Sequence, residues 1–199
     1  MLLSKMTLVL TLVLSMPALL EDWAVAKDQD GVMVYTRHVE GTSLKEFKGV
    51  IILKTTPDKV LAQIRDAEHH RDWMHNTKDS KIARWNSPDD FYTYAINDAP
   101  WPVADRDNVV HMQVSHPDAK TTRVKMTGAT GIVPEVEGVV RVKMLNGFWL
   151  IEEMPYGLVR VTQQCIADPG GSIPNWLVNS AVVDNPFNTL LGLQKRIGG

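Results

Sequence analysis

The sequence is poor in cysteine and carries no excess of either charge. Cys165 is the single cysteine, so it has no partner for an internal disulfide, and no zinc-ligand spacing surrounds it. The formal net charge is only -2 at pH 7, which offers no clustered basic face. These absences argue against a disulfide-stapled scaffold and against a nucleic-acid-binding protein.

The chain also lacks internal repeats, low-complexity tracts and an interdomain linker. Its 199 residues fit one domain with a sizeable core, and a hydrophobic content of 44% is that of an ordinary globular protein. We therefore expect one globular domain that acts as a monomer.

No catalytic motif stands out. Ser172, Ser180 and Cys165 have no histidine placed by a motif, and no Gly-x-Ser-x-Gly elbow occurs. The glycines at residues 128–131 lack the lysine of a phosphate-binding loop. The sequence thus predicts a protein that is not an enzyme and that needs no cofactor.

The nearest approach to a metal-binding group is His69, His70 and His75 with Asp72. Adjacent histidines on a helix point in different directions, and no further ligand follows at a suitable spacing. The mixed-charge run at residues 68–72 is instead typical of a solvated helix surface. We predict no metal site.

The N-terminus has the pattern of a signal peptide. Lys5 precedes an uncharged run over residues 6–20, which is shorter than the ~20 residues of a membrane span but suits a signal-peptide apolar region. Residues 1–20 are therefore predicted to be a signal peptide and residues 21–199 the mature domain. Two cleavage patterns compete, at residues 16–18 and at residues 24–26. This segment predicts a periplasmic or secreted protein; the alternative is an N-terminal helix packed on a cytoplasmic domain.

The first part of the domain mixes short elements. Residues 23–30 are predicted to form a short helix, and β-branched residues predict strands over residues 32–37 and 44–53. Thr56 and Pro57 then suit the N-cap and first position of a helix. Its apolar residues recur at helical spacing: Val60, Leu61, Ile64 and Ala67.

After this helix the chain is almost entirely strand. The predicted strands span residues 82–85, 91–96, 109–115, 121–126, 139–145, 148–152 and 158–167. Asn146-Gly147 indicates a tight hairpin between two of them, because both central positions of such a turn need positive φ. One antiparallel sheet of about seven to nine strands with few helices predicts an α+β domain.

Alternation along the strands predicts which face of the sheet is exposed to solvent and which is covered. Polar residues alternate with apolar residues, so one face of the sheet meets water and the other packs inward. The apolar members are Val110, Met112, Val114, Val140, Val142, Met144, Val159 and Val161.

A long helix over residues 174–197 is the one large element left to cover the apolar face. Ser172 suits its N-cap. Pro186 lacks an N–H and clashes with the carbonyl of Val182, so a kink or break is predicted there. Its apolar residues form two stripes: Ile173, Leu177, Val178 and Ala181, then Phe187, Leu190 and Leu191.

The ordered set of motifs resembles the START family, the steroidogenic acute regulatory protein-related lipid-transfer domains. The resemblance rests first on PWPVADRD at residues 100–107 and DPGGSIPNWLVN at residues 168–179. Further marks follow along the chain: Trp23, residues 27–32, 34–37 and 44–48, Asp66, Trp73, residues 139–141 and Trp149. The resemblance implies a helix-grip fold, in which a curved antiparallel sheet wraps around a long C-terminal helix and holds one apolar molecule.

Some lipid-binding relatives carry a buried charged pair, facing the ligand, on the strands that flank the loop at residues 100–107. Here the predicted inward positions are Tyr92, Tyr94 and Ile96 before the loop, and Val110, Met112 and Val114 after it. No opposed charges appear among them. We therefore expect a ligand held by shape, apolar contact and a tyrosine hydroxyl.

The predicted cavity wall and gate combine the sheet, the loop at residues 100–107 and the C-terminal helix. Their residues are Tyr92, Tyr94, Trp101, Arg106, Val110, Met112, Val114, Met126, Val142, Met144, Val161, Gln163, Leu177, Val178, Ala181 and Phe187. Trp101, between two prolines, is either a gate against the final helix or a loop tip packed on its own domain. Arg106 lies between Asp105 and Asp107, which predicts a local ion pair that braces the loop.

These features predict an exported, non-enzymatic carrier that binds a lipid or other apolar small molecule in an internal cavity. The expected task of the carrier is to transfer that molecule, with transient membrane contact. An alternative on the same fold is a polyketide cyclase or aromatase. Such an enzyme needs polar groups facing inward, and the candidates are Tyr92, Tyr94 and Gln163. A third interpretation is a domain whose interior is filled by its own side chains and that acts through partners.

Overall fold

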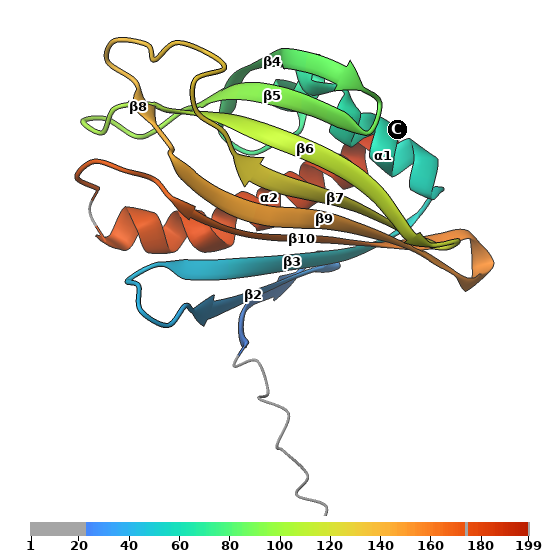
Figure 1. Cartoon of the computed structure of the whole chain (residues 1–199). Helices are drawn as coiled ribbons and strands as arrows, with labels where there is room; N and C mark the ends of the chain where they lie inside the picture. Colours follow the sequence, from blue (N-terminus) through green and yellow to red (C-terminus); the bar gives the residue numbers. More distant parts are fainter. Residues whose placement is uncertain (1–22, 174, 199) are drawn as a thin grey trace, which may run out of the picture.

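A ten-stranded sheet and a long C-terminal helix dominate the molecule, and the sheet curves around the helix (Figure 1). The computed structural model describes residues 23–173 and 175–198, so the predicted signal peptide lies outside the described residues. The strand order is β1-β2-β3-β10-β9-β7-β6-β5-β4, with the short β8 beside β6. All pairings except that of β8 are antiparallel, which confirms the predicted α+β helix-grip fold.

The bounds of the elements follow. The strands are β1 (Ala24–Gln29), β2 (Val32–His38), β3 (Lys45–Lys54), β4 (Thr77–Ser87), β5 (Asp90–Asn97), β6 (Arg106–Asp118), β7 (Thr121–Gly128), β8 (Val140–Arg141), β9 (Met144–Met154) and β10 (Leu158–Asp168). The helices are α1 (Pro57–Arg65) and α2 (Asn175–Gly198), with short 3₁₀ helices η1 (Ala67–Asp72) and η2 (Pro155–Gly157).

The chain path explains why β10, late in the sequence, pairs with β3, near the start of the described residues. After β3, the segment α1–η1 carries the chain to the far edge of the sheet, where β4 begins. The remaining strands return one beside the next until β10 pairs with β3. Thr56 caps α1 as predicted, since its side chain accepts a hydrogen bond from the backbone N–H of Lys59.

The inner face of the sheet, defined as the face turned toward α2, is apolar. Val110, Met112 and Val161 point inward as the alternation predicts, and they share one core with Phe187 and Leu190 of α2. α1 closes the same core with Val60, Leu61 and Ile64. The core therefore lies between the sheet, α1 and the C-terminal half of α2.

Two glycines let α2 approach its neighbours closely. A Cβ added at Gly49 of β3 would lie 2.8 Å from Cδ1 of Leu190, and one added at Gly192 would lie 2.0 Å from the carbonyl oxygen of Trp73. α2 runs through Pro186 as one helix, so a break there is wrong, and the kink that was its alternative stays a prediction. The proline is buried over Gly49, and this packing compensates for its missing N–H. Among the described residues, no helix is long and apolar enough to span a membrane.

The predicted helix at residues 23–30 is wrong, because Ala24–Gln29 forms the edge strand β1. Asp30 and Gly31, with φ of 52° and 77°, make a tight turn that joins β1 to β2. Five of the six residues of β1 are exposed, so no hydrophobic alternation marks the strand in the sequence. Pairing with β2 decides its conformation.

The predicted hairpin at Asn146-Gly147 is also wrong. Both residues lie inside β9, where they pair with β10 on one side and β7 on the other. A Cβ at Gly147 would lie 2.3 Å from the carbonyl oxygen of Gln164, so the glycine serves a close backbone approach and not a turn. The strand predicted over residues 139–145 accordingly divides into the short β8 and the start of β9.

Candidate functional site

The sheet and α2 bring many of the predicted wall residues together on the inner face. Those in the shared core are Val110, Met112, Met126, Val161 and Phe187, with Val114 packed against it. Val142 is buried beside β8. The residues of the shared core define an apolar surface on the inner face, as the alternation predicts.

A surface hollow of about 370 Å³ lies beside the segment that leads into α2. Met144 lines it together with Arg141, Lys143, Asp168 and Gly170. Gly170 and Gly171 both have positive φ, which gives this connection its sharp path. The hollow therefore lies at the rim of the sheet, next to the less buried half of α2.

Tyr92, Tyr94 and Ile96 do not face α2, so the predicted inward register of β5 is wrong. Phe91 pairs with the inward Met112, which turns the next residue outward. Tyr92 instead stacks on His111 on the outer face, with ring centroids 4.3 Å apart. Phe91 and Thr93 are the inward, buried residues of this strand. A one-residue shift of parity exchanges the two faces of a strand.

A buried ion pair joins β6 to β8 on the outer face. Nε of Arg141 lies 2.7 Å from Oδ1 of Asp107, and Nη2 lies 2.9 Å from Oδ2. The hydroxyl of Tyr94 donates to the same carboxylate at 3.1 Å. The hydrogen bonds from Arg141 lower the pKa of Asp107, whereas burial and that carboxylate raise the pKa of Tyr94. This pair does not contradict the expectation that the inward positions beside the loop carry no opposed charges, because it faces away from α2.

Arg106 makes no local ion pair, in contrast to the prediction. Its guanidinium donates to the carbonyl oxygens of Ala104, Pro169 and Gly170, the last at 3.3 Å. Asp105 binds Lys78 instead, at 2.9 Å. Burial lowers the pKa of Arg106. Arg106 thus ties the loop at residues 100–107 to the segment that leads into α2.

Trp101 is 93% exposed, so it is not a loop tip packed on its own domain. Pro100 and Pro102 beside it are exposed as well. The loop that carries it joins β5 to β6, at the end of the molecule where α2 begins (Figure 1). An exposed tryptophan of this kind is a feature of contact surfaces.

The two halves of α2 differ in how firmly they are held. Leu177 and Val178 are half-buried, and Ala181 is exposed. In the other half, Phe187 is 4% exposed and Leu190 is fully buried. Lys27 lies over the ring of Phe187, 3.6 Å from its centroid.

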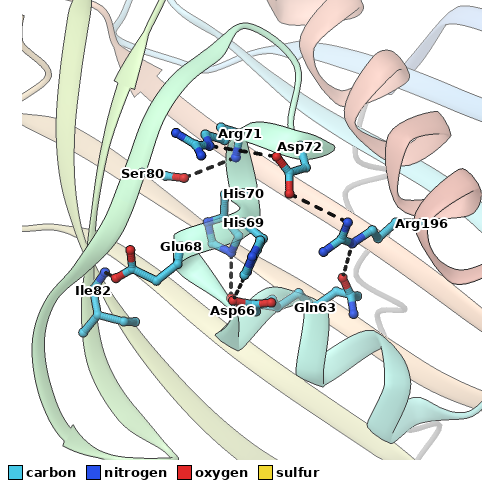
Figure 2. A network of polar contacts seen from close by, with 11 residues as sticks. Gln63, Asp66, Glu68, His69, His70, Arg71, Asp72, Ser80, Ile82 and Arg196 are labelled. Atoms are coloured by element: carbon cyan, nitrogen blue, oxygen red, sulfur yellow. Dashed lines mark hydrogen bonds and ion pairs between the residues drawn. The ribbon is translucent and has the colours of Figure 1, made fainter.

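Figure 2 shows how polar contacts fasten the C-terminal end of α2. Nη1 of Arg196 lies 3.7 Å from Oδ2 of Asp72, and Nε donates to Oε1 of Gln63 at 3.2 Å. The hydroxyl of Thr189 accepts from the backbone N–H of His75. The helix is therefore anchored at the end opposite the rim hollow.

The run at residues 68–72 is only partly the solvated surface that was predicted. His70 is 4% exposed, and its Nε2 lies 2.9 Å from the carbonyl oxygen of Ile64. His69 pairs with Asp66 on the exposed side (Figure 2). Burial lowers the pKa of His70. This histidine is a core residue.

Gln163 and Cys165 face inward from β10 beside Val161. Gln163 is 9% exposed, and its Oε1 has no hydrogen-bond partner within residues 23–173 and 175–198. Burial raises the pKa of the Cys165 thiol to about 12, so the thiol stays protonated. Neither residue meets a histidine or carboxylate arranged for catalysis along the described inner face.

The geometry is that of a helix-grip domain: a curved sheet with an apolar inner face, closed by a terminal helix that is firmly held at one end. The chain belongs to the START domain family, whose model matches residues 7–190.

Individual relatives agree with this assignment. An uncharacterized protein of Pseudomonas aeruginosa, PA1579, is 38% identical over 177 residues, which cover 89% of this chain and 87% of the relative. The mouse phosphatidylcholine transfer protein is 27% identical over 179 residues, covering 87% of this chain and 83% of the relative.

Solved structures share the architecture. A STAR-related lipid transfer protein from Xanthomonas axonopodis superposes with a TM-score of 0.82 at 37% identity, covering 89% of this chain and 99% of that one. The Zhui aromatase/cyclase from Streptomyces sp. R1128 matches at a TM-score of 0.54 and 11% identity, over 78% of this chain and 94% of that one. The second similarity extends to the fold alone.

Proposed function

We propose that the protein binds a lipid or other apolar small molecule between the inner face of the sheet and α2, and carries it without chemical change. The observation that carries the proposal is the apolar inner face beneath a helix whose first half is only partly buried. Burial of apolar surface stabilises a ligand by roughly 25 cal/mol per Å², so a lipid chain can be held without charged contacts.

The inner face also favours a carrier over a cyclase. Of the three polar candidates for acid/base chemistry, Tyr92 and Tyr94 lie on the outer side of the sheet. Gln163 alone faces inward, and a carboxamide neither gives nor takes a proton near neutral pH. A carrier needs no such group, and its ligand is recovered unaltered.

Release of the ligand requires α2, which covers the ligand, to move. α2 is anchored at its C-terminal end, and Pro186 lies where the buried half begins. The loop at residues 100–107 is tied by Arg106 to the segment before α2, so we propose that the loop and the first half of α2 open together.

The proposed opening end also carries the exposed Trp101. Tryptophan suits the interface between a membrane and water, because its ring is apolar and its N–H is polar. We propose transient membrane contact through this loop when the ligand is taken up or delivered.

The uncharged run at residues 6–20 supports a further part of the proposal, that the protein is exported and acts in the periplasm or outside the cell. Expression in a Gram-negative host, cell fractionation and N-terminal sequencing test it. A mature protein that begins shortly after residue 20 and lies outside the cytoplasm is expected. An intact N-terminus in the cytoplasmic fraction would refute export.

Transfer of a fluorescent lipid between donor and acceptor vesicles tests the carrier function. The rate should rise with protein concentration, and Pro186→Ala and Trp101→Ala should alter the release of bound lipid. Unchanged release rates in both variants reject the proposed gate. A transfer rate independent of the protein argues against the carrier itself.

A further inference from the structure

Two polar atoms deep in the described interior have no hydrogen-bond partner: Oε1 of Gln163 and Nε1 of Trp73. Gln163 is 9% exposed and Trp73 is 4% exposed. Buried polar groups are nearly always paired, because an unpaired one forfeits the hydrogen bonds it makes with water in the unfolded chain. Thr55 and Thr127 have unpaired hydroxyls as well, but those residues are only half-buried.

The two unpaired groups lie on one row across the inner face. Gln163 is the register partner of Trp149 on the neighbouring strand, and both side chains point inward. The ring of Trp149 lies 6.1 Å from that of Trp73. The row therefore runs from β10 across β9 to the end of η1, along the face on which the proposed ligand would lie.

The buried charges, in contrast, already have partners. Glu46 pairs with Arg37, and Asp107 with Arg141, both from the outer face of the sheet. Arg106 is held by carbonyl oxygens at the rim. The polar groups that the described interior offers to a guest are therefore uncharged.

The two groups are also complementary in kind. Oε1 of Gln163 accepts a hydrogen bond, whereas the indole N–H of Trp73 donates one. We infer that they recognise an uncharged lipid carrying a hydroxyl group, which donates to Gln163 and whose headgroup oxygen accepts from Trp73. The inference rests on the proposed lipid binding and specifies its ligand class: a neutral, hydroxylated lipid and not a zwitterionic or anionic one.

Three probes that share a hexadecyl chain test the inference: 1-hexadecanol and its methyl ether, each below its aqueous solubility, and hexadecylphosphocholine below its critical micelle concentration. Binding is measured by intrinsic tryptophan fluorescence and by the indole N–H resonance of Trp73 in ¹H–¹⁵N spectra. The resonance is assigned with Trp73→Phe. The alcohol should bind about fivefold more tightly than the ether, the effect of the one neutral hydrogen bond that only the alcohol can donate, and should shift the resonance.

Gln163→Met and Trp73→Phe keep the bulk of each side chain and remove its polar atom. Gln163→Met should lose the preference for the alcohol while its affinity for the ether stays near that of the wild type, because the ether has no hydroxyl to donate. Trp73→Phe should weaken the binding of the alcohol and of the ether alike, because both oxygens accept from the indole N–H. Each variant should also unfold at a higher denaturant concentration in the absence of probe, because an unpaired buried group has been removed. If one of the two variants fails to fold, the other still tests the inference.

The outcomes separate this inference from the proposal beneath it. Equal binding of alcohol and ether, or tightest binding of hexadecylphosphocholine, overturns the recognition of a neutral hydroxyl and leaves lipid binding intact. Failure of all three probes to bind, with no lipid retained on purification, overturns the carrier function and this inference with it.

Discussion

Arg141 holds both carboxylate oxygens of Asp107 although the two residues lie 34 positions apart in the sequence. The other donors of Arg141 reach the carbonyl oxygens of Val133 and Pro134, each at 3.1 Å. The pair therefore fastens the connection between β7 and β8 to the outer face of the sheet. The two charges therefore stabilise the framework of the domain and do not face the ligand.

Removing one partner of this pair should be costly. Asp107→Ala leaves the guanidinium of Arg141 buried without its counter-charge, and we expect a loss of about 3–5 kcal/mol in the free energy of unfolding. The double variant Asp107→Leu/Arg141→Met should recover part of the loss, because neither charge is then stranded. Urea denaturation measures the wild type and both variants, with Lys78→Ala, at an exposed pair, as a control that should change little. A loss as small as that of the control would contradict the account.

Gly192→Ala should destabilise the protein, although alanine normally favours a helix over glycine. The added methyl would lie 2.0 Å from the carbonyl oxygen of Trp73, a backbone atom that cannot rotate away. Overpacking of this kind costs about 1–3 kcal/mol or more. Gly198→Ala near the end of the same helix meets nothing within 4 Å and is the matched control. Equal thermal midpoints for the two variants would show that α2 does not pack as closely as described.

Arg106→Ala should speed the exchange of bound lipid. The substitution removes the hydrogen bonds to Pro169 and Gly170 that tie the loop at residues 100–107 to the start of α2. The dissociation rate of a fluorescent lipid should rise about fivefold or more, since about 1 kcal/mol of restraint is lost. Arg196→Ala, at the anchored end of the helix, is the comparison and should change the rate little. If Arg196→Ala has the larger effect, the helix opens from the other end.

Stability should fall as the pH drops below about 6.5, in part because of His70. Burial lowers the pKa of His70 from its ordinary 6.5, so the folded state binds the proton less readily than the unfolded chain does. The contribution is complete above the unfolded-state pKa and is lost as the pH falls from there toward the folded-state value.

Denaturation at about pH 7.5 and about pH 5.5 should reveal a loss on the order of 1 kcal/mol that His70→Asn reduces. His38→Asn, at an exposed histidine, should keep the wild-type profile. A profile for His70→Asn as steep as that of the wild type would assign the pH dependence elsewhere, with His75, whose pKa burial also lowers, as the next candidate.

The sequence predicts the elements whose signals are local. Thr56 and Pro57 mark the start of α1, and the alternation around Val110 places the inner face of β6 correctly. β1 is missed because it is an exposed edge strand that owes its conformation to β2. Asn146-Gly147 is misread because a glycine needed for close strand contact resembles one needed for a turn.

The site is harder to predict, since its contacts join distant parts of the chain. The register of β5 decides which of Phe91 and Tyr92 faces inward, and that register depends on pairing with β6. The link between Asp107 and Arg141 needs β8, a strand of two residues with no periodicity to reveal it. Gln163 is placed correctly because it shares parity with Val161, but only the structure shows that its carbonyl oxygen is unpaired.

Native mass spectrometry of the freshly purified protein tests the central claim most directly. The account predicts a second species, heavier than the chain by the mass of one lipid and stripped to the bare chain when the ions are activated. Extraction should return that lipid chemically intact and bearing an uncharged headgroup. A single species at the mass of the bare chain, unchanged after incubation with lipid vesicles, would contradict the account.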